Sequence, residues 1–166
     1  MSYPAAVITV SDRSAAGQRA DTAGPVAVSE LVRAGFSCDE AIVVPDGADS
    51  VERALWAVLA GGARLVVTTG GTGVGPRDET PEGSARVIGR EVPGIAEELR
   101  RIGASETPGG MLSRGRSGIV DPVPGVTKGA LVVNLPGSPK AVASGIPVVI
   151  SVARHVIEQL AGGDHA

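Results

Sequence analysis

The stretch VVTTGGTGVGPRDETPEG, residues 66–83, joins a β-branched run to a loop that holds four glycines within six residues. Valine and threonine favour strands, whereas Thr80-Pro81-Glu82 is typical of the N-cap, first turn and acidic dipole partner of a helix. The order strand, glycine loop, helix indicates one unit of a parallel α/β sheet. The N–H groups of such a loop can line a concave anion site, although a tight turn with no ligand has the same composition.

The same alternation of strand and helix patterns runs through the rest of the chain. Short apolar runs predict strands at 5–10, 41–44, 64–69 and 130–137. Helical spacing and end signals predict helices at 22–34, at 94–102 and at 145–161. A further helix is expected to be capped by Asp49 or Ser50 and to end at 60, and another to begin at 80. Residues 104–129 are rich in Gly, Ser and Pro and predict a hairpin or flap. We expect a single domain over residues 1–166, with parallel strands joined by right-handed crossovers.

Composition restricts the function classes. Hydrophobic residues make up 43% of the chain but aromatic residues only 2%, so the core must be aliphatic. A net charge of −3 predicts no nucleic-acid-binding face, and the single Cys38 excludes an intramolecular disulfide framework. The N-terminus does not resemble a signal peptide, and no apolar stretch approaches the roughly 20 residues of a membrane span. These features predict a cytoplasmic protein without a membrane partner.

Several catalytic schemes do not fit the pattern. No Lys-Ser/Thr pair follows the glycines, as a P-loop requires, and Pro76 stands where a dinucleotide fingerprint has its third glycine. A Ser-His-Asp triad needs a histidine at the loop edge. The two histidines instead lie in the last predicted helix, at position 155, and in the tail, at position 165.

Acidic residues follow three different predicted strands. Asp12, Asp46 and Asp78 each come just after a strand, and the carboxyl ends of parallel strands meet at one edge of a sheet. Carboxylates that converge beside an anion site suit Mg²⁺, but an isolated Asp78 could equally be a solvated helix cap. Arg77 could pair with a phosphate or be a surface charge. Ser138 could cap a helix or form a second anion site.

Two longer blocks carry a resemblance. TTGGTGVGPRDETPE (68–82), followed by NLPGSPKAV (134–142), resembles the molybdopterin-binding family that includes MogA, MoaB and a domain of gephyrin. The resemblance extends over nearly the whole chain, through SDRSAAG and DTAGP near the start, VVPD (43–46), PGIAEELR (93–100) and MLSRG (111–115). It implies a three-layer α/β/α sandwich with a mostly parallel, doubly wound sheet and an antiparallel edge strand.

The resemblance also implies an activity. Adenylyltransferases of this family join molybdopterin to AMP with ATP and Mg²⁺ and release pyrophosphate, and relatives assemble as trimers or hexamers. A homotrimer and a molybdenum-insertion protein as partner are therefore expected. The alternative is a non-catalytic molybdopterin-binding or scaffold protein of the MoaB type, and an unrelated nucleotide-binding enzyme is a third interpretation.

Functional residues follow from the matching positions. Asp78 and Asp46 match acids needed for activity, and we expect both to be catalytic and to hold Mg²⁺ or organise the site. The ligand-binding positions implied by the resemblance are Thr69, Gly70, Gly71, Thr72, Gly73, Asp12, Asn134, Pro136, Gly137 and Ser138. Residues 116–129 are longer than a bare turn requires, so they are expected to alter the pocket rim or a subunit contact.

Overall fold

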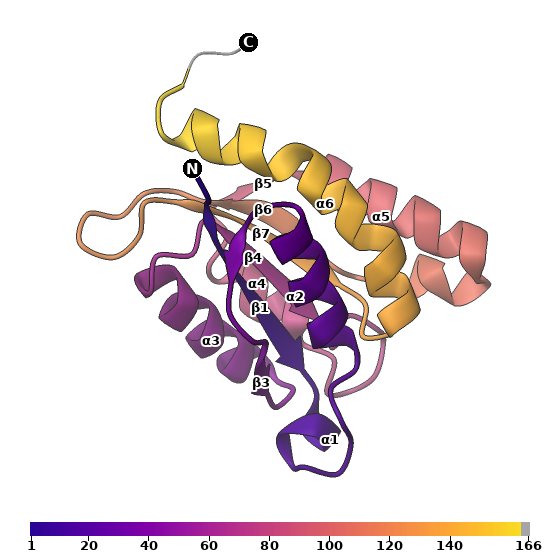
Figure 1. Ribbon diagram of the computed structural model, residues 1–166. Coiled ribbons are helices and arrows are strands. Elements are labelled where there is room, and N and C mark those ends of the chain that lie inside the picture. Colours follow the sequence, from indigo (N-terminus) through magenta and orange to yellow (C-terminus); the bar gives the residue numbers. More distant parts are fainter. Residues whose placement is uncertain (164–166) are drawn as a thin grey trace.

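A mixed sheet with helices on both faces forms the centre of the molecule in the computed structural model, which describes residues 1–163 (Figure 1). The sheet has seven strands: β1 Pro4–Val10, β2 Ser37–Cys38, β3 Ile42–Val44, β4 Leu65–Thr69, β5 Arg90–Glu91, β6 Ser117–Val120 and β7 Ala130–Leu135. The helices are α1 Asp12–Ala15, α2 Ala23–Arg33, α3 Ala48–Ala60, α4 Thr80–Ala85, α5 Pro93–Glu106, the 3-10 helix η1 Pro108–Leu112 and α6 Pro139–Leu160.

The strand order is β2-β1-β4-β7-β6-β5, and β3 pairs with the second half of β1. The strands β3, β1, β4 and β7 are parallel, and Val7, Val67 and Val133 stand in register across the last three. β6 is antiparallel to β7, and the short β5 is antiparallel to β6. The predicted mostly parallel sheet is therefore confirmed. The antiparallel strand β6 is not the edge strand as expected, because β5 pairs with its outer side.

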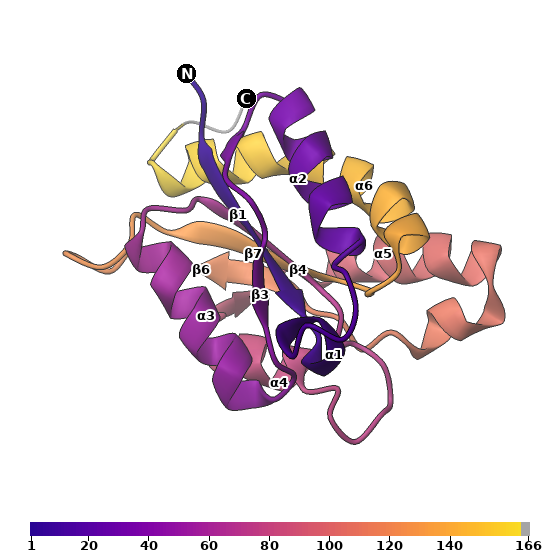
Figure 2. The same ribbon diagram turned by 60° about the horizontal axis from the view of Figure 1, so that its bottom comes forward.

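Alternate residues of the central strands belong to two separate cores. Val7, Val67 and Val133 pack with α2, α5 and α6 on one face, whereas Val66 and Val132 pack with α3 on the other. Figure 2 shows the sheet between these two helix layers. Every residue of β4 and β7 is buried, as expected for parallel strands that are covered on both faces. The three-layer α/β/α sandwich is confirmed.

Helices α3 and α4 begin differently from the sequence-based expectation. α3 starts at Ala48, so neither Asp49 nor Ser50 caps it. The main-chain N–H of Ala48 instead donates to a carboxylate oxygen of Glu79, at 2.9 Å. Thr80 is the first residue of α4 rather than its cap, and its hydroxyl donates to the carbonyl of Gly70. The main-chain N–H of Thr80 donates to the Gly71 carbonyl at 3.1 Å. The first N–H group of each helix is thus bound by a group distant in sequence rather than by a local cap.

Helix α6 starts at Pro139, six residues before the predicted position. Ser138 caps it by accepting a hydrogen bond from the N–H of Ala141, at 3.1 Å, which confirms the helix-cap interpretation of this serine. With 22 residues, α6 is the one helix in the described part of the chain long and apolar enough to span a membrane, a length that the sequence analysis did not expect. Its buried stripe packs on the sheet, as in a core helix: Val142, Ile146, Val149, Ala153 and Ile157.

Residues 104–129 form several short elements rather than one flap. α5 continues to Glu106, η1 and β6 follow, and a hairpin at 121–129 is closed by pairing of Val123 with Thr127. This hairpin projects from the sheet in Figure 1 and lines a groove together with Met1–Pro4. None of residues 116–129 lines either cavity at the carboxyl edge, so the expected role at the pocket rim is wrong, whereas the alternative role in a subunit contact stays a prediction. Position 165 lies outside the described residues.

Candidate functional site

The loops that follow β1, β3, β4 and β7 meet at one edge of the sheet, as predicted. The N–H of Ser11 donates to the carbonyl of Val44, and the N–H of Gly70 donates to that of Leu135. After β1 the chain continues to β2 and β3 on one side, whereas β4 lies on the other side, next to β7. Such a switch point opens a crevice outside the carboxyl ends of the strands, where α/β sheets bind ligands.

Glycine is required where the loop leaves β4. Gly70 has φ +92° and Gly71 φ +66°. A Cβ on Gly70 would lie 2.3 Å from the carbonyl oxygen of Val10, and one on Gly71 would lie 2.2 Å from the Thr80 hydroxyl. The loop therefore presents bare main chain to its surroundings, because no side chain fits at these positions.

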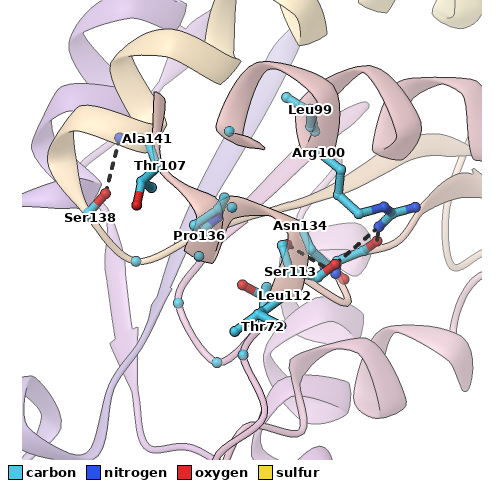
Figure 3. Close-up of a pocket in the computed structure, with 18 of the residues that line it drawn as sticks. Thr72, Leu99, Arg100, Thr107, Leu112, Ser113, Asn134, Pro136, Ser138 and Ala141 are labelled. Atoms are coloured by element: carbon cyan, nitrogen blue, oxygen red, sulfur yellow. Dashed lines mark hydrogen bonds between the residues drawn. The ribbon is translucent and has the colours of Figure 1, made fainter. Parts of the chain in front are cut away.

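A cavity of about 420 Å³ lies between the glycine loop, α5 with η1, and the start of α6 (Figure 3). Nine predicted site residues line it: Gly70, Gly71, Thr72, Gly73, Asp78, Asn134, Pro136, Gly137 and Ser138. The far wall, which sequence reasoning missed, includes Leu99, Arg100, Thr107, Leu112 and Ser113. Most of these residues belong to the blocks PGIAEELR (93–100) and MLSRG (111–115). The resemblance included both blocks but assigned no function to them.

A second cavity, of about 320 Å³, lies on the other side of Gly70 and Gly137. Both glycines and Ser138 line the two cavities together. A Cβ on Gly137 would lie 3.2 Å from the Cα of Gly70, so the partition between them is bare main chain. Of the predicted ligand residues, Thr69 faces this second cavity only, and its hydroxyl donates to that of Thr9.

Asp12 and Asp46 contact one another directly. The N–H of Asp12 donates to the Asp46 carboxylate at 2.9 Å, and the N–H of Asp46 donates to the Asp12 carboxylate at 3.0 Å. Arg77 donates two hydrogen bonds to Asp12, each 3.1 Å long, and one to the Asp46 carbonyl at 2.8 Å. Arg77 is thus a surface charge that is paired within the protein, and its predicted contact with a phosphate stays a prediction. Arg77 clamps three loops of the site.

Asp78 lies against the same glycine loop from the cavity side. Its Oδ2 accepts the N–H of Gly75 at 2.9 Å, and a Cβ on Gly73 would come within 2.9 Å of that oxygen. Asp46 approaches the loop at Gly71, where an added Cβ would lie 3.1 Å from its Oδ1. The cap interpretation of Asp78 is wrong, because Glu79 holds the cap position of α4.

The electrostatics of the two contacting acids differ. Burial raises the pKa of Asp46, and the charges of Asp12 and Asp78 add to this effect. The hydrogen bonds from Arg77 lower the pKa of Asp12. Of these two acids, Asp46 therefore has the less compensated negative charge, and a nearby cation would favour its ionised form.

The chemistry of these acids fits Mg²⁺ only in part. Oδ1 of Asp46 and Oδ1 of Asp78 accept no hydrogen bond from any described residue, so each can still coordinate a cation. Within residues 1–163, no three His, Cys, Asp or Glu side chains come together as a metal site. Mg²⁺ commonly binds one or two carboxylates together with phosphate oxygens and water. The site thus suits Mg²⁺ that arrives with a phosphate ligand.

Asn134 borders the cavity, but the protein uses its carboxamide. Its Oδ1 accepts the N–H of Arg116 at 3.0 Å, and its Nδ2 donates to the hydroxyls of Thr68 at 3.0 Å and Ser84 at 2.9 Å. The side chain is buried and joins β4, β7 and α4. Its predicted part in ligand binding stays a prediction. The structure needs asparagine at this position because the carboxamide accepts one hydrogen bond and donates two.

Fold and site together define an α/β domain in which a glycine loop, approached by two carboxylates, borders a cavity at the carboxyl edge of the sheet. Residues 6–155 match the family described as "Probable molybdopterin binding domain", and the chain belongs to this family. This finding confirms the resemblance seen in the sequence.

Relatives and solved structures agree with this membership. The chain is 40% identical over 161 residues to a molybdenum cofactor biosynthesis bifunctional protein of Synechococcus elongatus, matching 97% of the chain and 48% of that protein. It is 36% identical over 154 residues to a molybdopterin adenylyltransferase of Pyrococcus furiosus, matching 92% and 88%. A molybdopterin biosynthesis Mog structure from Mycobacterium ulcerans superimposes with a TM-score of 0.84 at 38% identity, covering 98% and 99%. The chain spans about half the length of the bifunctional relatives it matches.

Proposed function

We propose that this protein acts in molybdenum cofactor biosynthesis and transfers the adenylyl group of ATP to molybdopterin, forming adenylyl-molybdopterin and pyrophosphate. One observation carries the proposal: the carboxylates of Asp46 and Asp78 approach the same glycine loop, which lines a cavity of about 420 Å³. Relatives named molybdopterin adenylyltransferase, at 34–36% identity, support it.

The reaction needs electrostatic positioning more than proton transfer. The terminal phosphate oxygen of molybdopterin attacks the α-phosphorus of ATP, a new P–O bond forms, and the bond to the leaving pyrophosphate breaks. The attacking phosphate is already ionised, so no general base is required. The N–H groups of Gly71 and Gly73, together with Lys140 at the cavity wall, would offset the negative charge that the two reactants bring together. Asp46 and Asp78 would hold Mg²⁺, which supplies positive charge between phosphate oxygens.

The test is a pyrophosphate-release assay with ATP, Mg²⁺ and molybdopterin. We expect turnover by the wild type and a fall of about 100-fold or more for Asp78→Asn, the scale of losing one electrostatic group. Asp121→Asn is the matched control, because Asp121 pairs with Arg90 at a distance from the site. Wild-type turnover by a folded Asp78→Asn variant at saturating Mg²⁺ would disprove the assigned role.

A second candidate function is a non-catalytic molybdopterin-binding or scaffold protein of the MoaB type. Similarity to solved structures named MoaB, at 38% and 32% identity with TM-scores of 0.78 and 0.85, supports this alternative. It would bind molybdopterin and release no pyrophosphate in the same assay. ATP would then leave the affinity for molybdopterin unchanged.

Assembly and location are further parts of the proposal. We propose a homotrimer, supported by family resemblance and by the exposed apolar side chains of Val123 and Val126 on the projecting hairpin. A molybdenum-insertion protein as partner and a cytoplasmic location stay predictions from the sequence.

A further inference from the structure

Arg114 makes an unusual set of contacts at the base of the cavity. It follows Ser113, which lines the cavity wall after η1. Its main-chain N–H donates to the Thr72 carbonyl at 2.8 Å. Its guanidinium donates to the carbonyls of Gly73 at 2.8 Å and Asp78 at 2.5 Å, and its remaining terminal nitrogen pairs with Glu82.

These contacts bracket the turn that orients Asp78. Between Gly73 and Asp78, the N–H of Gly75 donates to the Asp78 carboxylate and the N–H of Asp78 donates to the Gly75 carbonyl. The tip of the loop is otherwise exposed, with Val74 70% accessible. Ordering a glycine costs more conformational entropy than ordering any other residue, so a glycine-rich turn needs additional contacts to hold one conformation. A planar guanidinium that grips both ends of the turn supplies the restraint that glycine side chains cannot.

The other end of this connection is also anchored. Arg100 of α5 donates to the carbonyls of Gly115 at 3.0 Å and Ser113 at 3.4 Å, and Figure 3 shows Arg100 extended toward this segment. Residues 113–115 are therefore fixed to the far wall of the cavity. Arg114 connects that wall to the glycine loop, so it holds the two walls of the cavity in one arrangement.

We infer that Arg114 is a positioning residue, which acts through the main chain at Gly73 and Asp78 to present the Asp78 carboxylate to the cavity. Each of the three guanidinium nitrogens bonds to the protein, and Arg114 does not line the cavity, whereas its neighbours Ser113 and Gly115 do. Arg114 is therefore assigned an indirect role rather than contact with the reacting groups. The inference rests on the proposed function, since it deepens the role assigned there to Asp78.

The test compares Arg114→Lys and Arg114→Ala with Arg116→Lys. Arg116 is a matched control, because its side chain is similarly exposed and pairs with Glu91 away from the glycine loop. Lysine keeps the charge but cannot grip two carbonyls and a carboxylate in one fork. We expect hydrogen–deuterium exchange across residues 70–79 to be about tenfold faster in both Arg114 variants and unchanged in Arg116→Lys.

The second measurement is steady-state pyrophosphate release. Because a small displacement of a positioned group can cost about 100-fold, we expect kcat to fall about 10- to 100-fold in Arg114→Lys, with KM for ATP little changed. In a protein that stays folded, a purely structural role of Arg114 would not lower kcat while leaving KM for ATP unchanged. Unchanged loop exchange in Arg114→Ala, or wild-type kcat in Arg114→Lys, overturns the inference.

Failure of the proposed function gives a different result. If the wild type releases no pyrophosphate, the adenylyl-transfer proposal is wrong, whereas the exchange comparison needs no substrate and still applies. In that case the dissociation constant for molybdopterin is measured in place of kcat. Binding about tenfold weaker in Arg114→Lys than in Arg116→Lys supports the positioning role, and equal binding overturns it.

Discussion

Asp46 shows how one side chain of the site carries an unfavourable charge. Its main-chain N–H and its carboxylate are both bonded to Asp12, and its ionised form is opposed by burial and by two neighbouring acids. Arg77 compensates the negative charge of Asp12 more directly than that of Asp46, because both of its hydrogen bonds to a carboxylate go to Asp12. Active sites commonly keep such charges at the expense of stability.

Asp46→Asn should therefore raise the thermal stability at neutral pH. The raised pKa of Asp46 means that its contribution to folding is present while it is protonated, and is lost as the pH rises through the pKa in the folded protein. Asparagine can still accept the N–H of Asp12 without that loss. We expect a higher Tm at pH 7, and a gain that disappears as the pH falls below the ordinary carboxyl pKa of about 3.9.

Asp12→Asn is the opposite control in the same thermal-unfolding series. Its pKa is lowered by Arg77, so its stabilisation is present above the ordinary carboxyl pKa and is lost as the pH falls through the lowered value in the folded protein. We expect a lower Tm at pH 7. A Tm for Asp46→Asn at or below that of the wild type at pH 7 would contradict the electrostatic explanation.

Gly70→Ala should be strongly destabilising for two separable reasons. A left-handed backbone conformation costs an alanine about 1–2 kcal/mol, and the Cβ would also press against the Val10 carbonyl at 2.3 Å, which overpacks the strand end by about 1–3 kcal/mol. Gly62→Ala is the control, because its φ of +98° is similar and nothing lies within 4 Å of the added Cβ. Denaturant unfolding should show Gly70→Ala to be the less stable variant.

At the scale of elements, strands and helix faces were predictable from the sequence, whereas the starts of α3 and α4 were not. The buried runs of β1, β4 and β7 are visible as apolar stretches because both faces of the sheet are covered. The start of α3 depends on the Glu79 carboxylate, which lies 31 residues away in sequence. Long-range partners of this kind leave no local pattern for sequence reasoning to detect.

The site was predictable to a similar extent. Glycines, acids and the turn after β7 lie where the sequence placed them, because crossover rules bring the ends of parallel strands together. Arg114 was missed, since its partners are mostly main-chain carbonyls, which every residue has. Asn134 was assigned to ligand binding from the family resemblance, and its structural role could not be predicted because its three side-chain hydrogen bonds form only when β4, β7 and α4 are assembled.

Pro147 provides a test of helix α6. It lies inside the helix and is exposed, where proline lacks an N–H and clashes with the preceding turn. Pro147→Ala should stabilise the protein by about 1–3 kcal/mol, measured by denaturant unfolding. Pro139→Ala, at the first turn of the same helix, should change little because proline is tolerated there. Equal effects of the two substitutions would contradict this explanation.

At the scale of the whole molecule, assembly is the property most open to measurement. The projecting hairpin places Val123 and Val126, each more than 40% accessible, beside a groove lined by the N-terminal residues. If the proposed homotrimer forms, sedimentation should give a mass of about 50 kDa, three times the chain mass of 16.5 kDa. A single species at the mass of one chain, over the micromolar range, would exclude the trimer.

The hydrogen bond from Ala48 to Glu79 has a consequence for how the site can move. Glu79 directly follows Asp78, so the residue that satisfies the first turn of α3 sits at the end of the glycine loop. If the loop swings outward, the end of α3 loses its partner and begins to fray. We therefore expect the loop and the first turn of α3 to open together, so that the packing of α3 against the sheet limits the opening of the crevice.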